Sequence, residues 1–123
     1  MTSIAILAYI SLLSVIHFVA DFVLQSNWMA VNKSKSFAAL GSHVGVYTLV
    51  LLIAGMMMFN HTVYLYSFVL INGLLHFLTD FVTSRINAEL YKNEDKHNFF
   101  VMVGADQLIH ALCLVWTFWY FLI

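Results

Sequence analysis

The chain contains no proline, a single cysteine and very little charge. Aspartate, glutamate, lysine and arginine together make up only 9% of its 123 residues. The lone Cys113 lies in an apolar run, so the chain can form neither a disulfide framework nor a cysteine metal cluster. The formal net charge is −1 and no basic run occurs, which argues against a nucleic-acid partner.

Hydrophobic residues make up 63% of the chain, and its mean hydropathy is +0.90. A soluble domain of this size could not bury so much apolar surface, whereas a bilayer core roughly 30 Å thick needs about 20 apolar residues per helical span. We therefore predict an all-α polytopic membrane protein, a four-transmembrane-helix bundle that forms one integral membrane domain over residues 1–123 in the lipid bilayer. The predicted spans cover about residues 4–24, 41–59, 63–82 and 99–122.

Two polar connections, about residues 25–40 and 83–98, separate the first span from the second and the third from the fourth. The first part of the second connection is predicted to lie as a short helix on the membrane surface. All five lysines and arginines fall in these two connections. The positive-inside rule then places both connections on the cytoplasmic side of an inner (cytoplasmic) membrane, with both termini and the turn at 60–62 on the other side.

One pattern, His-Phe-x-x-Asp-Phe, occurs twice, at His17–Phe22 and at His76–Phe81. The histidine and aspartate of each copy are four residues apart, which places them on one face of a helix, one turn apart. Asp106 and His110 form a third pair in reverse order. The repeat indicates a bundle built from a duplicated helical hairpin, in which His43 of the first copy corresponds to His110 of the second.

The predicted topology puts all these polar groups near the cytoplasmic ends of the four spans. An aspartate deep in a span costs about 2.5–3.5 kcal/mol on insertion-based scales, so three of them need compensation. Three kinds of compensation are available: a bound cation, internal Asp–His hydrogen bonds, or a water-filled path.

Neutral imidazole and carboxylate are ligands for zinc, manganese and iron, and the set available here exceeds the needs of one tetrahedral ion. We predict a site for one or two divalent ions, with zinc favoured and manganese or iron as alternatives. The predicted metal ligands are His17, Asp21, His43, His76, Asp80, Asp106 and His110. The expected function is a metal-dependent hydrolase that activates water against an ester, phosphoester or amide of an amphiphilic or cytoplasmic substrate, with Asp80 and Asp106 as catalytic residues.

Three further residues are predicted to bind substrate, which is an unidentified small molecule or lipid. Gln25 and Gln107 lie one turn and one residue from ligand aspartates, and Lys33 borders the mouth of the site. Interfacial hydrogen bonding explains the glutamines equally well, and lysine in a cytoplasmic loop commonly sets topology. Asn72, one turn before His76, is a candidate hydrogen-bond partner of that imidazole.

Other interpretations stay open. The Asp–His pairs could be polar clasps that set helix packing in lipid. They could also move protons or a cation in a small transporter or channel component, which would work as a homo-oligomer because four short spans enclose little volume. Residues 50–53 and 65–70 continue no polar path through the outer half, which favours chemistry at one face. A regulatory membrane partner without chemistry is the third alternative.

The run His17-Phe18-x-x-Asp21-Phe22-x-Leu24-Gln25, followed by Lys33, His43 and His76-x-x-x-Asp80, resembles the bacterial and phage membrane family of unknown function DUF3307. The resemblance spans nearly the whole chain and implies a membrane location, but no activity. More distantly, the arrangement is similar to small inner-membrane proteins described as metal-dependent hydrolases. Only the ligand types are shared there, so the hydrolase expectation is an analogy.

Overall fold

Every regular element of the computed structural model, which describes residues 1–123, is helical. The elements are α1 (Ser3–Phe18), its π-helical continuation η1 (Val19–Val23), α2 (Asn27–Asn32), α3 (Phe37–Met58), α4 (Val63–Lys92) and α5 (Lys96–Leu122). Four helices are long and apolar enough to cross a membrane: α1 with η1, α3, α4 and α5. The prediction of an all-α membrane protein with four such helices is confirmed.

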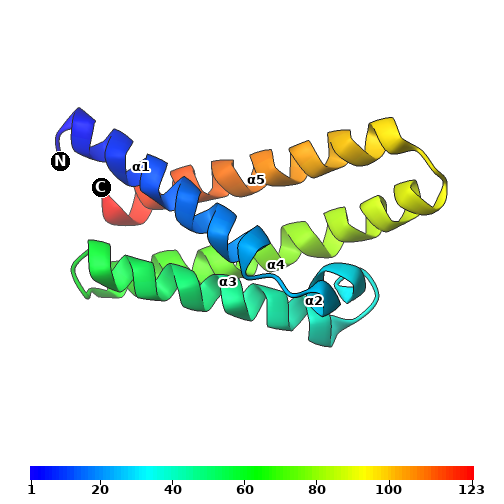
Figure 1. The fold of residues 1–123 in the computed structure, drawn as a ribbon. Coiled ribbons are helices and arrows are strands. Elements are labelled where there is room, and N and C mark those ends of the chain that lie inside the picture. Colours follow the sequence, from blue (N-terminus) through cyan, green and yellow to red (C-terminus); the bar gives the residue numbers. More distant parts are fainter.

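The four long helices form a ring in which each contacts two others. α4 packs against α3 and α5, and α1 packs against the same two helices from the other side. Figure 1 shows both termini and the turn between α3 and α4 at one end, and α2 and the α4–α5 connection at the other. We call this second end the basic end, because it carries all the lysines and arginines: Lys33, Lys35, Arg85, Lys92 and Lys96.

Side-chain caps fix where the helices begin. At the start of α3, the Ser36 hydroxyl accepts the backbone N–H of Ala39. At the start of α5, the Asp95 carboxylate accepts the side-chain amide and the backbone N–H of Asn98. These two hydrogen bonds lower the pKa of Asp95, since they favour its charged form.

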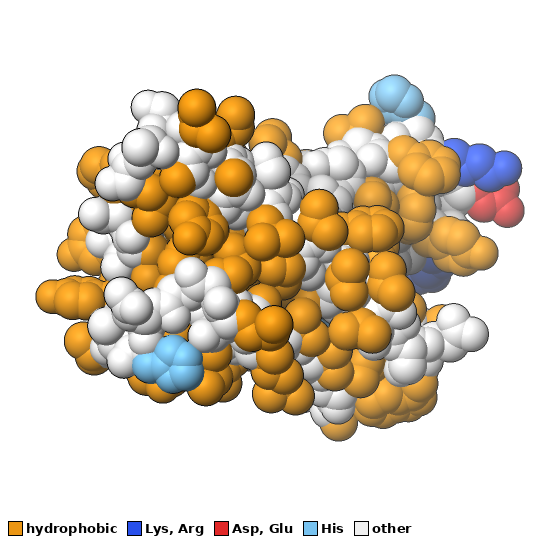
Figure 2. All heavy atoms as spheres, turned by 60° about the vertical axis from the view of Figure 1, so that its left-hand side comes forward, with side chains coloured by type: hydrophobic (Ala, Val, Ile, Leu, Met, Phe, Trp, Pro, Cys, Tyr) orange, Lys and Arg blue, Asp and Glu red, His pale blue; other side chains and the backbone are white.

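The surface of the bundle is apolar and its buried core is small. Only 24 of the 123 residues are buried, and many large hydrophobic side chains point outward. Figure 2 shows hydrophobic side chains over most of one face, with charged groups confined to one edge. The apolar core, which includes Leu13, Tyr47, Phe68 and Phe118, fills the interior on the side away from the basic end. This distribution suits helices solvated by lipid.

Helix α4 is longer than the sequence predicted. A polar connection was expected over 83–98, beginning with a surface helix, but α4 continues without a break to Lys92. Its 30 residues rise about 45 Å, more than the roughly 30 Å core of a bilayer. Residues 83–92 contain good helix formers and no glycine or proline, so polarity there marks the departure from the membrane core and not the end of the helix.

The first copy of the duplicated motif is not regular α-helix. The chain widens into the π-helix η1 over Val19–Val23, and the N–H of Leu24 bonds to the carbonyl of Val19. In the second copy, His76 and Asp80 both lie in regular α-helix within α4. Single π-helical turns are frequent at functional sites. The two copies are therefore alike in sequence and different in backbone, a difference that the residue pattern did not reveal.

The contact between α3 and α4 predicts a glycine requirement at position 73. A Cβ at Gly73 would lie 2.6 Å from the Thr48 hydroxyl, which itself donates to the carbonyl of Val44. We expect Gly73→Ala to destabilise the fold by about 1–3 kcal/mol, because β-branched Thr48 cannot move without breaking that bond. Thermal unfolding in detergent, followed by circular dichroism, measures the effect.

Gly45→Ala is the matched control on α3. A Cβ there meets nothing within 4 Å, so helix propensity alone should stabilise the variant by up to about 1 kcal/mol. Equal melting temperatures for the two variants would contradict the described packing.

Candidate metal centre

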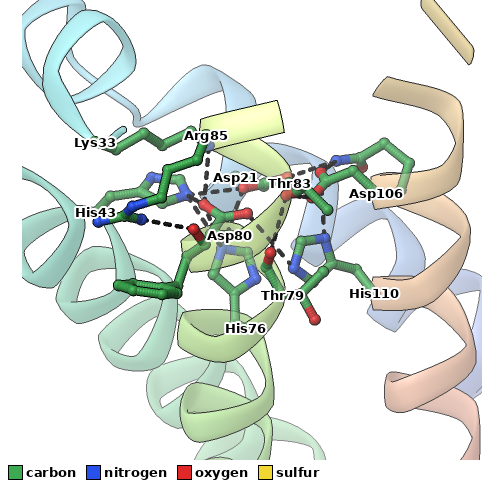
Figure 3. A network of polar contacts seen from close by, with 12 residues as sticks. Asp21, Lys33, His43, His76, Thr79, Asp80, Thr83, Arg85, Asp106 and His110 are labelled. Carbon is green, nitrogen blue, oxygen red and sulfur yellow. Dashed lines mark hydrogen bonds and ion pairs between the residues drawn. The ribbon is translucent and has the colours of Figure 1, made fainter. Parts of the chain in front are cut away.

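The seven histidines and aspartates predicted as metal ligands lie together inside the bundle, toward the basic end. All seven are buried, with no more than 8% of any residue exposed. They project from α1 with η1, from α3, from α4 and from α5, so each of the four long helices contributes. Figure 3 shows how the side chains from α3, α4 and α5 turn toward the same point, together with Asp21 of η1.

His43 lies at the centre of this cluster. Its Nε2 is 3.0 Å from Asp21 Oδ1, 3.0 Å from Asp80 Oδ2 and 3.1 Å from His76 Nε2. A ring nitrogen carries at most one hydrogen, so it can donate to only one of these three atoms. His43 Nε2 therefore forms at most one hydrogen bond here. In the other two contacts, polar atoms lie close together with no hydrogen between them.

The same four atoms have the spacing of a tetrahedral coordination shell. His76 Nε2 lies 3.3 Å from Asp21 Oδ1 and 3.8 Å from Asp80 Oδ2, which adds two further separations to the three around His43. Zinc bonds of about 2.0–2.2 Å place tetrahedral ligand atoms about 3.3–3.6 Å apart. Asp21, His43, His76 and Asp80 could therefore hold a metal ion.

Two further groups of possible ligands overlap with this one. His17, Asp21 and His110 form the second group, and Asp80, Asp106 and His110 form the third. Asp21 and Asp80 each belong to two groups, so either carboxylate has the position to bridge two ions. Each of the three groups could hold a metal ion.

Asp106 has a different environment from the other two aspartates. Its Oδ1 accepts the Thr83 hydroxyl at 2.5 Å, and its Oδ2 accepts the Gln107 amide at 3.0 Å. The same Oδ2 lies 3.5 Å from Nδ1 of His110, whose Nε2 faces Asp80 Oδ1 at 3.7 Å. Asp106 and Asp80 thus lie on opposite sides of the His110 ring, as in a carboxylate–histidine pair, although neither ring nitrogen of His110 forms a hydrogen bond.

The Nδ1 atoms of the four buried histidines have no hydrogen bond within the protein. They belong to His17, His43, His76 and His110, and only that of His110 lies near a carboxylate. Metal-binding imidazoles usually donate this second N–H to a carboxylate or a carbonyl. Aromatic stacking fixes one ring instead: Tyr47 lies against His76 with ring centroids 4.0 Å apart and planes 14° apart.

The three predicted substrate-binding residues lie in different settings. Gln107 is inside the cluster, where its amide donates to Asp21 Oδ2 at 2.9 Å and its oxygen faces His17 Nε2 at 3.3 Å. Gln25, just beyond η1, has a buried side-chain oxygen with no partner. Lys33, at the end of α2, donates to Asp80 Oδ2 at 2.9 Å. Gln107 and Lys33 therefore hold the aspartates in place.

The cluster carries excess negative charge. It contains three carboxylates and one ammonium, that of Lys33, so its net charge is −2 when the histidines are neutral. Arg85 does not change this sum inside the cluster, because its guanidinium lies 3.7 Å over the Phe81 ring and donates to the Phe81 carbonyl. Uncompensated charge costs several kcal/mol per ion in a low-dielectric interior. One divalent cation would neutralise the cluster.

Two residues that contact the cluster were not predicted from the sequence, and one residue was predicted to bond to the wrong partner. Thr83 was placed in a loop and Tyr47 was not considered, although they lie three residues after Asp80 and four after His43 on their helices. Asn72 does not contact His76: its amide donates to the Thr117 hydroxyl at 2.7 Å and to the Phe68 carbonyl. The interpretation of Asn72 as a partner of His76 was wrong, because the rotation of α4 directs it toward α5.

Comparison with known proteins gives one match. A family model described as "Protein of unknown function (DUF3307)" matches residues 9–123, which include the whole cluster. No curated protein and no solved structure matched the chain.

The ion pair between Lys33 and Asp80 yields a stability prediction. With a chelator present, we expect Lys33→Met to lower the free energy of unfolding by about 1–3 kcal/mol, because it leaves a buried carboxylate without its cation. The range lies below that of a fully buried pair, since 20% of the Lys33 side chain is exposed. Lys35→Met, which removes a nearby charge without an ion pair, should change stability by less than about 0.5 kcal/mol. Equal effects in denaturant titrations would contradict this role of Lys33.

Proposed function

The chain belongs to the DUF3307 family, whose description assigns no activity, and we propose that it is a membrane-embedded metal-dependent hydrolase. One observation carries the proposal: buried ligand atoms of Asp21, His43, His76 and Asp80 lie within 4.8 Å of one another, and five of their six separations are 3.0–3.8 Å. A polar clasp could pair the N–H of His43 with Asp80 and the N–H of His76 with Asp21, but these two N–H groups would then face each other with their nitrogens 3.1 Å apart. A cation bound by Asp21, His43 and His76, with Asp80 beside its open position, removes this conflict.

We assign the resident ion to Asp21, His43 and His76. Catalytic zinc sites keep three protein ligands and leave the fourth position to water or substrate. Asp80 lies beside that position, and its bond from the Lys33 ammonium holds it as a carboxylate next to the ion. Zinc is the favoured metal for a four-coordinate site with imidazole ligands, and manganese or iron would require additional ligands. A second ion would bridge through Asp21 or Asp80.

The proposed reaction is hydrolysis of an ester or phosphoester. A divalent ion held by these residues would lower the pKa of a bound water to about 7 and polarise the substrate oxygen. Asp80 accepts the proton as the water oxygen bonds to the carbonyl carbon or phosphorus. The bond to the alcohol oxygen then breaks, and His110 donates a proton to that oxygen. Asp106 orients His110 and is thus a positioning residue rather than the second catalytic carboxylate that the sequence suggested.

The rival function is movement of protons or a cation through the bundle. The hydrogen bond from Asn72 to Thr117 does extend the buried polar residues one turn beyond His76. Beyond that pair, Leu65, Phe68 and Phe118 are completely buried and fill the interior. The polar cluster therefore ends within the bundle and approaches only the basic end, which favours chemistry over transport. The positive-inside rule supports a cytoplasmic position for that end, in the inner membrane of a bacterial cell.

The metal content of the purified protein tests the proposal directly. Inductively coupled plasma mass spectrometry of protein in mild detergent should find about one equivalent of zinc, manganese or iron per chain. His76→Ala should reduce this content to background, because it removes a ligand from the centre of the cluster. His97→Ala, at an exposed histidine, is the control and should retain the metal. Metal-free wild-type protein that remains folded would overturn the proposal.

The Asp80→Asn variant distinguishes two roles of Asp80, that of a general base and that of a metal ligand. The amide keeps the shape of the carboxylate and an oxygen for Lys33, so we expect the metal content to stay at the wild-type level. Hydrolysis of p-nitrophenyl phosphate should fall by about 10²–10⁴-fold, since an amide cannot accept the proton. Loss of the metal together with the activity would instead make Asp80 a ligand, and unchanged activity would remove it from the mechanism.

A further inference from the structure

An apolar cavity of about 310 Å³ lies between α1 and α5, near the chain termini. Every residue that lines it is hydrophobic; they include Ile6 and Ile10 of α1 and Val115, Trp116 and Trp119 of α5. Trp116 and Trp119 are more than 60% exposed, so the cavity opens to the outside of the bundle. In a membrane, the outer surface of the bundle contacts lipid. We call this cavity the α1–α5 groove.

The groove and the metal centre lie on the same seam between α1 and α5. On α1, Ile10, Ser14 and His17 are four and three residues apart, which places them on one helix face. On α5, Val115, Ala111 and Gln107 follow each other at four-residue intervals. The seam ends where His17 Nε2 faces Gln107 Oε1 at 3.3 Å, inside the polar cluster.

The residues between the groove and the cluster are small. Ser14 and Ala111 occupy the middle of the two stripes, and both are exposed. The Ser14 hydroxyl donates to the Ile10 carbonyl one turn back and so is not directed across the seam. The side chains at these two positions are therefore too short to block an apolar chain that runs from the groove toward the cluster.

The distance along this seam matches the length of an acyl chain from one leaflet, and a head group at His17 would lie six residues, about 9 Å, inside the basic end of the Ser3–Val23 span. Ile10 and Ile6 precede His17 by seven and eleven residues, which corresponds to about 10 and 17 Å along the helix. Half of a hydrocarbon core roughly 30 Å thick is about 15 Å. A lipid whose head group lies at the depth of His17 would thus place the end of its acyl chain in the groove.

We propose that the substrate is a membrane lipid of the leaflet at the basic end, bound with its ester-linked head group at the metal centre and its acyl chain along the seam into the α1–α5 groove. The inference rests on the proposed hydrolase function for its chemistry, and the groove supplies the substrate class. A phosphate-bearing head group suits the cations available there, namely the ion and the Lys33 ammonium. The polar and apolar parts of the site then match the two parts of one amphiphile.

Binding of a single-chain phosphate lipid tests this inference without requiring turnover. The probe is palmitoyl lysophosphatidic acid, titrated against detergent-solubilised protein and detected by native mass spectrometry. Ala111→Phe fills the seam and should weaken binding by about tenfold or more. The adjacent Leu112→Phe places the same ring on the lipid-facing surface and should change affinity by less than about twofold. Glycerol 3-phosphate, which lacks the chain, should bind all three proteins equally.

The outcomes separate this inference from the proposed function. If Ala111→Phe binds the lipid as wild type does while retaining metal and hydrolysing p-nitrophenyl phosphate, the groove proposal fails and the hydrolase stands. If the metal is absent but the lipid still binds in an Ala111-dependent way, the hydrolase fails and the groove remains a lipid site. If Ala111→Phe changes the mass of the assembly instead, the groove is an interface between copies of this chain, and the lipid proposal is overturned.

Discussion

The structure depends on one constraint, which is the need to compensate three carboxylates buried within an apolar bundle. Asp21, Asp80 and Asp106 are nearly inaccessible, and Lys33 is the single ammonium that reaches them. Lipid offers no hydrogen bonds, so the compensating groups have to come from the protein, from a bound ion or from water that enters at the basic end. His43 Nε2 lies within 3.1 Å of three polar atoms and can share a hydrogen with only one of them, which leaves the cluster able to hold a metal ion.

Several irregular features of the fold bring compensating groups to the cluster. The π-helix η1 contains Asp21, the short helix α2 ends at Lys33, and the extension of α4 carries Thr83 to Asp106. The cluster is closed toward the opposite end by the apolar core and borders lipid through the seam between α1 and α5. In the proposed reaction on an amphiphile, water would enter at the basic end and an acyl chain would lie along the apolar seam.

Much of this arrangement could be predicted from the residues. The apolar runs gave four spans, and the i,i+4 Asp–His pairs gave the residues that meet inside them, because polar groups in a membrane helix must face the bundle interior. Element boundaries were less predictable: the polar residues after Val82 suggested a loop, yet their helix propensity keeps them in α4. The seven predicted ligands do lie together inside the bundle, but their partners were incompletely predicted, since Thr83 was missed and Asn72 was misassigned.

The sequence by itself determined that this is a helical membrane protein with a concentration of imidazole and carboxylate near one end, because composition and helical periodicity act locally along the chain. Only the tertiary structure decided which atoms face one another. Lys33 meets Asp80 across 47 residues, Asn72 meets Thr117 across 45, and His17 meets Gln107 across 90. Such pairings follow from the rotation of each helix about its axis and from the contacts between helices, which no local pattern specifies.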